Sequence, residues 1–179
     1  MLDSADHATD ERYILVEMAR GVADDGVEFG ARARVGRQVA TDADHAVWLP
    51  LWQGYQRFYM TEIAAATSDT TWQRFLDPAE PMHAALAWHD GQAIGLVHWI
   101  YHRSTWTPGD YCYLQDLFIS KDVRSSGAGR KLIEHVYREA QAQGCSRTYW
   151  MTHESNSKAM LLYERIAERS GFIQYRKVF

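Results

Sequence analysis

The sequence predicts an α/β or α+β fold, a sandwich built on a mixed sheet. Strand-like segments come first as an antiparallel meander, and after them strands alternate with helices. Asp90-Gly91 lies between two of the strand-like segments and is a strong hairpin signal. A chain of 179 residues, 46% hydrophobic and 23% charged, is large enough for one domain with a real core.

The N-terminal part of the chain differs from the rest. Residues 1–32 mix acidic residues with glycines, and only Tyr13 to Ala19 could form a short helix or strand. We expect residues 1–32 to be an extension that is loosely ordered or that packs on a partner. One domain would follow over residues 33–179, with Arg34 to Thr41 as its first strand.

An aromatic stripe then predicts a helix with Asp42 or Asp44 as its N-cap. Pro50 lies inside the pattern, so we expect a kink or a break there. Such a stripe is usually core, but part of it could line a pocket for an amine, because aromatic faces attract cations. The residues at helical spacing are Trp48, Leu51, Trp52, Tyr55, Phe58 and Tyr59.

The remaining elements follow in a regular order. We expect strands at residues 83–88, 93–101, 111–119, 147–152 and 172–179. Helices are expected at residues 70–76, at 131–144 and after residue 156. The long middle helix has one apolar face, made by Leu132, Ile133, Val136, Tyr137 and Ala140.

The segment between the strand at 111–119 and this helix could hold a phosphate group. It reads Arg124-Ser125-Ser126-Gly127-Ala128-Gly129, followed by Arg130. Glycines let a ligand approach the backbone, and the first amides of a helix have no partners within it. The helix dipole and the arginines add positive charge there. A tight strand-to-helix turn without a ligand explains the two glycines equally well.

Two motifs, in this order, resemble those of the GCN5-related N-acetyltransferase (GNAT) superfamily. R-x-x-G-x-G resembles its acetyl-CoA-binding motif, and N-S-K-A-M-L-L-Y, from Asn156 to Tyr163, resembles its N-x-x-A-x-x-x-Y motif. The resemblance covers residues 34–179 and points to the yeast histone- and polyamine-type group, which includes a D-amino-acid N-acetyltransferase. It implies the GNAT fold, a mostly antiparallel central sheet flanked by helices on both faces.

The resemblance also implies roles for the matching residues toward acetyl-CoA, the co-substrate. Backbone groups of the strand end and Asn156 would bind pantetheine, and the amides of the glycine segment would bind the diphosphate. Tyr163 would protonate the departing thiolate. The implied acetyl-CoA-binding residues are Leu117, Phe118, Ile119, Arg124, Ser125, Ser126, Gly127, Ala128, Gly129, Arg130, Asn156 and Ala159.

The amine must lose a proton before it attacks, and Asp116 is the residue we expect to accept it. Strand alternation would place Asp116 on one face with Leu114 and Phe118. Apolar neighbours raise the pKa of a carboxyl group, which suits a base. Asp116 could instead be a structural carboxylate or a binding anion for a cationic substrate. Glu154 is a weaker candidate for the base, and a chain of water molecules could replace either.

Charge and composition indicate which partners and which compartment to expect. The net charge of −4 argues weakly against nucleic acid and against an anionic membrane. No apolar run approaches the length of roughly 20 residues that spans a membrane, and no signal peptide opens the chain. We expect Cys112 and Cys145 to be reduced thiols of a cytoplasmic protein. The histidines lack the spacing of a zinc site, so no metal is expected.

The first functional hypothesis is therefore an acetyl-CoA-dependent N-acetyltransferase that acts on a small primary amine, a polyamine or an amino acid. The second is the same enzyme class acting on a protein lysine or N-terminus. The third is a sensor that binds acetyl-CoA without chemistry, which Tyr163 disfavours. The resemblance also implies a homodimer, because relatives often dimerise through C-terminal strands, and Phe172 to Phe179 is apolar enough to join a partner's sheet.

Overall fold

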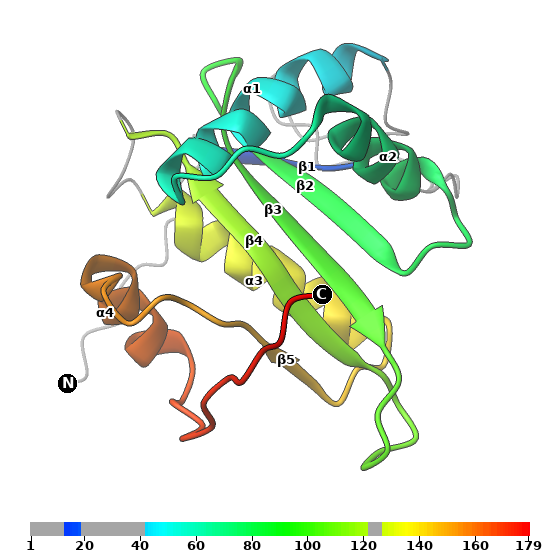
Figure 1. Ribbon diagram of the computed structural model, residues 1–179, viewed down its shortest axis with the longest axis vertical. Coiled ribbons are helices and arrows are strands. Elements are labelled where there is room, and N and C mark those ends of the chain that lie inside the picture. The colour runs from blue at the N-terminus through cyan, green and yellow to red at the C-terminus, as the bar shows by residue number, and fades with distance from the viewer. Residues whose placement is uncertain (1–12, 19–41, 122–126) are drawn as a thin grey trace, which may run out of the picture.

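A computed structural model of the chain describes residues 13–18, 42–121 and 127–179 (Figure 1). These residues form a five-stranded sheet whose strands lie in the order of the sequence. The first four strands pair antiparallel, and the fifth pairs parallel with the fourth, which confirms the predicted mixed, mostly antiparallel sheet. The strands are β1 (Tyr13–Met18), β2 (Met82–His89), β3 (Gln92–His102), β4 (Tyr111–Ile119) and β5 (Arg147–Tyr149).

Helices cover both faces of the sheet, as the resemblance implied. α1 (Asp42–Phe58) and α2 (Ala65–Leu76) pack on one face, called here the α1/α2 face. α3 (Ala128–Ala142) packs on the opposite face, called the α3 face, and runs behind the strands in Figure 1. α4 (Ser157–Ile166) follows β5 and is joined to α3 by the hydrogen bond from the Tyr137 hydroxyl to the Ile166 carbonyl.

Each face of the sheet has its own hydrophobic cluster. Successive side chains of a strand point to opposite faces, so a strand covered on both sides is apolar throughout, as β2 and β3 are in their central residues. The α3-face cluster includes Val97, Trp99, Leu132, Ile133 and Val136. The α1/α2-face cluster includes Trp48, Trp72, Phe75, Leu86 and Leu96.

A β-bulge in β4 changes which residues share a face. His98 of β3 is opposite Asp116, but the next residue, Trp99, is opposite Leu114, so β4 has one extra residue there. Leu114 therefore packs in the α3-face cluster, whereas Phe118 packs in the α1/α2-face cluster. Asp116 shares the face of Phe118, as predicted, but the prediction that Leu114 lies on that same face is wrong.

The N-terminal predictions are only partly within the described residues. Tyr13–Met18, which the sequence allowed as a short helix or strand, forms β1 and pairs antiparallel with β2. The predicted first strand, Arg34 to Thr41, lies outside the described residues. The domain boundary after residue 32 stays a prediction for the same reason. α1 continues through Pro50 as one helix, so no break occurs there.

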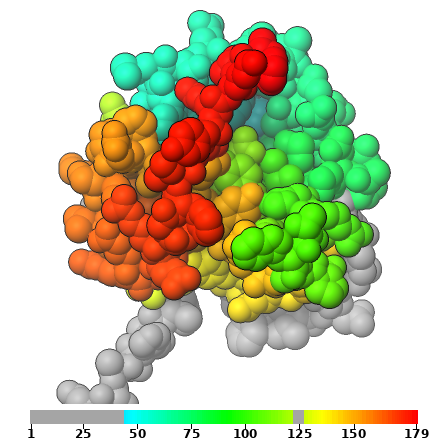
Figure 2. All heavy atoms as spheres, turned by 60° about the horizontal axis from the view of Figure 1, so that its bottom comes forward, coloured from blue at the N-terminus to red at the C-terminus, as the bar shows by residue number. Residues whose placement is uncertain are grey.

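The predicted C-terminal strand does not form. Residues 167–179 have neither helical nor strand structure, and Phe172, Ile173, Tyr175, Val178 and Phe179 are exposed. Apolar and aromatic residues favour a strand only where an open sheet edge pairs with them. Figure 2 shows the tail, in red, lying on the surface of the molecule. β5 is also shorter than predicted, because it ends at Tyr149 rather than at Thr152.

Candidate active site

The candidate site begins where β4 and β5 separate. Their parallel register covers only the pairs from Tyr111–Arg147 to Tyr113–Tyr149. β4 continues to Ile119, while the chain after Tyr149 leaves the sheet and leads to α4 (Figure 1). This separation exposes one edge of β4 next to α4. The edge includes Leu117 and its neighbours, which the sequence assigned to the pantetheine arm.

The N-terminus of α3 lies at the end of this same edge. Gly127 is its N-cap and has a left-handed backbone with φ 84°, a conformation that glycine adopts without strain. No side chain caps the helix there, and its first turn has no acidic residue. A Cβ at Gly127 would meet no described atom within 4 Å, and one at Gly129 would lie 3.7 Å from Ile119. The first amides of α3 are thus suited to a phosphate group.

Part of the predicted diphosphate segment cannot be placed. Arg124, Ser125 and Ser126 lie outside the described residues. Arg130 is exposed, and its Nε donates to Glu134 Oε1 at 2.7 Å, so its charge is partly neutralised within α3. Ala128 is buried under the sheet and anchors the start of the helix.

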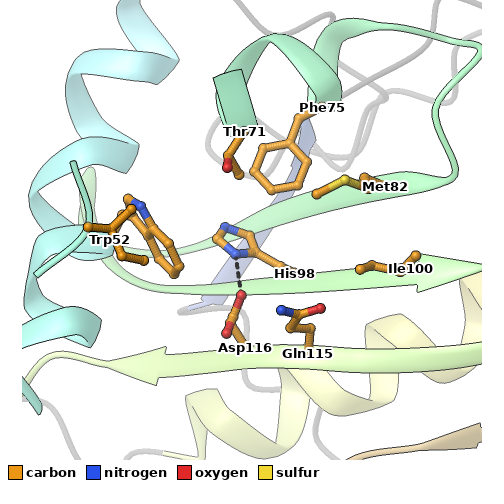
Figure 3. Close-up of a pocket in the computed structure, with 9 residues that line it drawn as sticks. Trp52, Thr71, Phe75, Met82, His98, Ile100, Gln115 and Asp116 are labelled. Atoms are coloured by element: carbon orange, nitrogen blue, oxygen red, sulfur yellow. Dashed lines mark hydrogen bonds and ion pairs between the residues drawn. The ribbon is translucent and has the colours of Figure 1, made fainter. Parts of the chain in front are cut away.

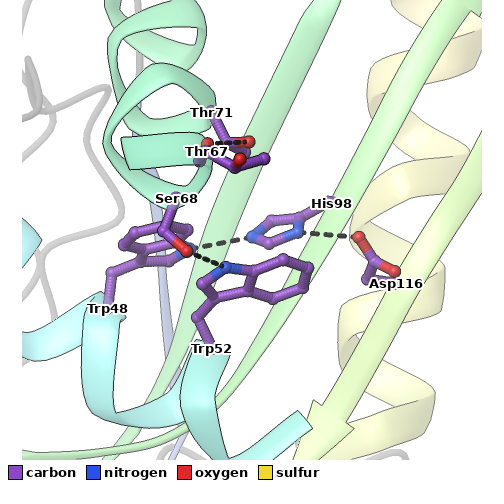
Figure 4. A network of polar contacts seen from close by, with 7 residues as sticks. All are labelled: Trp48, Trp52, Thr67, Ser68, Thr71, His98 and Asp116. Carbon is purple, nitrogen blue, oxygen red and sulfur yellow. Dashed lines mark hydrogen bonds and ion pairs between the residues drawn. The ribbon is translucent and has the colours of Figure 1, made fainter. Parts of the chain in front are cut away.

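Asp116 is held by a buried chain of hydrogen bonds (Figure 4). Trp48 Nε1 donates to His98 Nε2 at 2.9 Å, and His98 Nδ1 lies 3.0 Å from Asp116 Oδ2. An indole nitrogen only donates, so Nε2 of His98 accepts and the ring's proton is on Nδ1. Neutral His98 therefore donates to the Asp116 carboxylate. The side chains are deeply buried: His98 is 3% and Asp116 is 8% exposed.

Three tyrosines surround the same carboxylate. The Tyr55 hydroxyl donates to Asp116, and burial followed by this charge raises the pKa of Tyr55. Burial, and after it the Asp116 charge, also raises the pKa values of Tyr59 and Tyr113. Raised values keep all three phenols neutral near pH 7, where they can donate hydrogen bonds. Tyr55 belongs to α1, Tyr59 directly follows the last residue of that helix, and Tyr113 belongs to β4.

Tyr163 reaches the site from α4. Its ring is half-buried and packs edge-on against Trp150, with 5.3 Å between the ring centroids. Burial, and after it Tyr59, raises the pKa of Tyr163 to about 12. Tyr59 interacts electrostatically with Asp116 and with Tyr163, so it lies near both groups.

Two further predicted residues lie on the approach to Tyr163. Asn156 stands at the N-cap of α4, but its side chain does not cap the helix and donates instead to Thr152 Oγ1 at 3.1 Å. Ala159 is half-buried one turn further on. Glu154, the weaker candidate for the base, is exposed in the turn before α4. The helix therefore presents Asn156, Ala159 and Tyr163 in the expected order.

Sequence reasoning missed the role of His98 and the grouping of the tyrosines. Sequence reasoning considered the histidines only as metal ligands, and no group of potential metal-ligating residues occurs in the described part of the chain. Asp116, the partner of His98, is opposite it only because of the sheet register and the bulge, neither of which a sequence pattern shows. Tyr55 and Tyr59 carried a signal, because four-residue spacing puts them on one helix face.

The described helices include none that is long and apolar enough to cross a bilayer.

Comparison with known proteins identifies the class to which this fold and site belong. The family model described as the acetyltransferase (GNAT) family matches residues 48–167. This range contains the split in the sheet, the start of α3 and Tyr163. The chain therefore belongs to the GNAT acetyltransferase family and is an N-acetyltransferase. Proteins of this family use acetyl-CoA, so acetyl-CoA is its acetyl donor.

Individual relatives agree with this assignment. The chain is 36% identical over 136 residues to a D-amino-acid N-acetyltransferase of Saccharomyces cerevisiae, covering 75% of this chain and 84% of the relative. A thialysine N-ε-acetyltransferase of Sus scrofa is 34% identical over 92 residues, which are 51% of this chain and 49% of that protein. The fold also matches the structure of AAC(6')-Iy in complex with a CoA-containing bisubstrate analogue. The TM-score is 0.61 at 20% sequence identity, and the match covers 73% of this chain and 92% of that chain.

Proposed function

We propose that this protein transfers the acetyl group of acetyl-CoA to the primary amine of a small molecule, a polyamine or an amino acid, by direct attack. The names of the relatives support a small amine, because D-amino acids and thialysine are both small amines. The observation that supports the chemistry most is that Tyr59 lies near both the buried Asp116 side chain and the Tyr163 phenol, which brings the two groups into one region beside the β4–β5 split.

Acetyl-CoA is proposed to lie along the open edge of β4. The backbone of Leu117, Phe118 and Ile119 binds pantetheine, together with Asn156, and Ala159 packs beside it. The diphosphate binds the segment from Arg124 to Arg130, where the amides of Ala128 and Gly129 open α3. The absence of a side-chain cap on α3 supports this placement, because those amides are left to a ligand.

The proposed reaction moves two protons. An ammonium group has a pKa near 10, so the incoming amine first gives a proton to Asp116, directly or through water. Its nitrogen then attacks the thioester carbonyl, a C–N bond forms and the C–S bond breaks. Tyr163 donates its proton to the departing CoA thiolate and regains one from the amide nitrogen or from water. The raised pKa of Tyr163 supports this role, because the phenol stays protonated at neutral pH.

A small acceptor is favoured over a protein lysine or N-terminus. The cavity beside Asp116 has a volume of about 180 Å³ and is walled by α1, α2 and three strands, which suits a small molecule better than an extended peptide. The test is a panel of polyamines, L- and D-amino acids and lysine-containing peptides, assayed by release of the CoA thiol. Acetylation of the peptides alone would contradict the proposal, as would acetyl-CoA binding without transfer to any amine.

We also propose that the protein is a homodimer in the cytoplasm. The exposed apolar tail, from Phe172 to Phe179, has the composition of a strand but no pairing partner among the described residues. The strand of a second copy would supply one. Light scattering tests this, and deletion of residues 172–179 should convert the dimer to a monomer. The free thiols of Cys112 and Cys145 are consistent with a reducing compartment.

A further inference from the structure

A pocket on the α1/α2 face opens directly beside Asp116 (Figure 3). Its volume is about 180 Å³. The walls come from both helices, from the linker between them and from three adjacent strands. The lining residues are Trp52, Ile63, Thr71, Phe75, Met82, His98, Ile100, Gln115 and Asp116.

The pocket is polar at one end and apolar at the other. Asp116 and Gln115 belong to β4, whereas Met82 belongs to β2, two strands away and roughly 10 Å across the sheet. Figure 3 shows Asp116 at one end of the group, with Met82 and the Phe75 ring at the other. A molecule whose ammonium faces Asp116 would therefore extend its substituent over hydrocarbon and aromatic surface.

The charge in the pocket limits what the substituent can be. Asp116 is the one acidic side chain among the described residues that line it. His98 is neutral, because its Nε2 accepts from Trp48 and its Nδ1 donates to Asp116. A second ammonium, three or four methylenes from the first, would lie at the apolar end without a counter-charge. Burial of an unpaired charge is strongly unfavourable, so a diamine fits poorly.

The volume of the pocket indicates the size of the substituent. An apolar cavity of about 150 Å³ is large enough to hold a benzene molecule. A pocket of about 180 Å³ therefore accommodates a phenyl ring or a branched aliphatic chain. Such a group would replace water on Phe75, Met82 and Ile100, and removal of apolar surface from water is the main source of affinity in such a site.

We propose that the preferred acceptor is a primary amine with one ammonium group and a compact apolar substituent, which occupies this pocket while the ammonium faces Asp116. This inference rests on the proposed function and selects one part of it. It favours amines and amino acids with aliphatic or aromatic side chains over polyamines and over amino acids with a second amine.

Four amines test the inference with the full-length protein and acetyl-CoA. Phenethylamine and 3-methylbutylamine carry the apolar group, 1,4-diaminobutane replaces it with a second ammonium, and ethylamine lacks it. We expect kcat/KM to be at least tenfold higher for each of the first two than for 1,4-diaminobutane and for ethylamine. Equal or higher efficiency with 1,4-diaminobutane overturns the inference and leaves the proposed function intact. No acetylation of any amine overturns the proposed function itself.

Two adjacent threonines of α2 provide a matched pair of variants. Thr71 lines the pocket and Thr70 is exposed outside it, yet the hydroxyl of each donates to the carbonyl four residues earlier. Thr71→Leu should lower the phenethylamine-to-ethylamine ratio of kcat/KM at least fivefold, because the larger side chain fills the pocket. Thr70→Leu should leave that ratio unchanged. If the phenethylamine-to-ethylamine ratio is the same in Thr71→Leu as in Thr70→Leu, the substituent does not bind in this pocket.

A gain of function completes the test. Ile100 is half-buried in the wall of the pocket, and Ile100→Asp places a second carboxylate there. This variant should shift the 1,4-diaminobutane-to-phenethylamine ratio of kcat/KM at least tenfold toward the diamine. Thermal melting of each variant checks folding. If Ile100→Asp does not fold, the pair at Thr70 and Thr71 still decides the question.

Discussion

The hydrogen bond from Trp48 to His98 fixes which ring nitrogen of His98 carries the proton beside Asp116. Because Trp48 can only donate, its bond to His98 Nε2 leaves the imidazole proton on Nδ1, which faces Asp116. The Tyr55 hydroxyl also donates to Asp116, so two neutral groups bond to this side chain. A carboxylate in this setting can attract an ammonium and then accept its proton, and His98 acts as a positioning residue for it.

Tyr163→Phe should lower kcat by at least tenfold and leave the Kd for acetyl-CoA nearly unchanged. The substitution removes the hydroxyl that is proposed to protonate the thiolate but keeps the ring that packs against Trp150. Steady-state kinetics and calorimetry with acetyl-CoA check the two parts. An unchanged kcat would show that the proton comes from another donor.

His98 variants separate positioning from simple packing. His98→Leu removes the donor to Asp116 and should lower kcat about tenfold, with acetyl-CoA affinity unchanged. His98→Asn places an amide N–H near the former Nδ1, so it should recover a large part of that loss. Kinetics of both variants, with their melting temperatures, check this prediction. Equal activity of the two variants would mean that the hydrogen bond to Asp116 has no part in turnover.

At the scale of elements, the proposed acetyl-CoA site depends on β4 and on the start of α3. A helix N-terminus without a capping side chain has free amides, and a left-handed glycine directs the chain into it. The edge of β4 leads to the same point, since Ile119 packs against Gly129. The proposed path of acetyl-CoA is therefore continuous from the diphosphate to the thioester.

Gly127→Glu should abolish acetyl-CoA binding. The new side chain adds a negative charge where the diphosphate is expected, at a backbone φ of 84° that disfavours glutamate. Gly91→Glu is the matched control, because Gly91 also has a positive φ, 76°, and open space around it, but lies in the β2–β3 hairpin. Calorimetry should show binding only in the control, and normal affinity in Gly127→Glu would refute the loop assignment.

The sequence predicted the elements that local patterns encode and missed those that depend on pairing. The hairpin at Asp90-Gly91, the amphipathic α3 and the order of Asn156, Ala159 and Tyr163 were all predicted and are present. The bulge in β4 depends on register against β3, so no local pattern reveals it. The tail shows the opposite failure, because its apolar composition favoured a strand but no sheet edge pairs with it among the described residues.

At the scale of the whole molecule, titratable groups buried in or against the α3-face cluster make folding depend on pH. On the alkaline side, burial raises the pKa values of Cys112, Tyr101 and Tyr163 among others. The folded state then holds these protons more tightly than the unfolded chain does. Their contribution to the free energy of unfolding is complete below the pKa values of the unfolded chain, near 9 for the thiol and 10 for the phenols. It is lost as the pH rises through the higher pKa values of the folded state.

On the acid side, His135 of α3 has the opposite effect. It packs edge-on against Trp99 in the α3-face cluster, and its Nε2 is buried without a hydrogen-bond partner among the described residues. Burial, and after it the charge of Arg138, lowers the pKa of His135 from 6.5 to about 4. The folded state therefore favours neutral imidazole. The contribution of His135 to the free energy of unfolding is complete above pH 6.5 and is lost as the pH falls toward 4.

His135→Leu should remove this acid-side loss. A shift from 6.5 to about 4 corresponds to at most about 3 kcal/mol of unfolding free energy, since each pKa unit is worth about 1.4 kcal/mol. Urea unfolding of the wild type should show this fall between pH 7 and pH 4, and the variant should show a smaller one. His153→Leu is the control, because His153 is exposed in the turn before α4 and its loss should leave the pH dependence unchanged. Parallel curves for wild type and His135→Leu would assign the acid sensitivity to carboxyl groups elsewhere in the molecule.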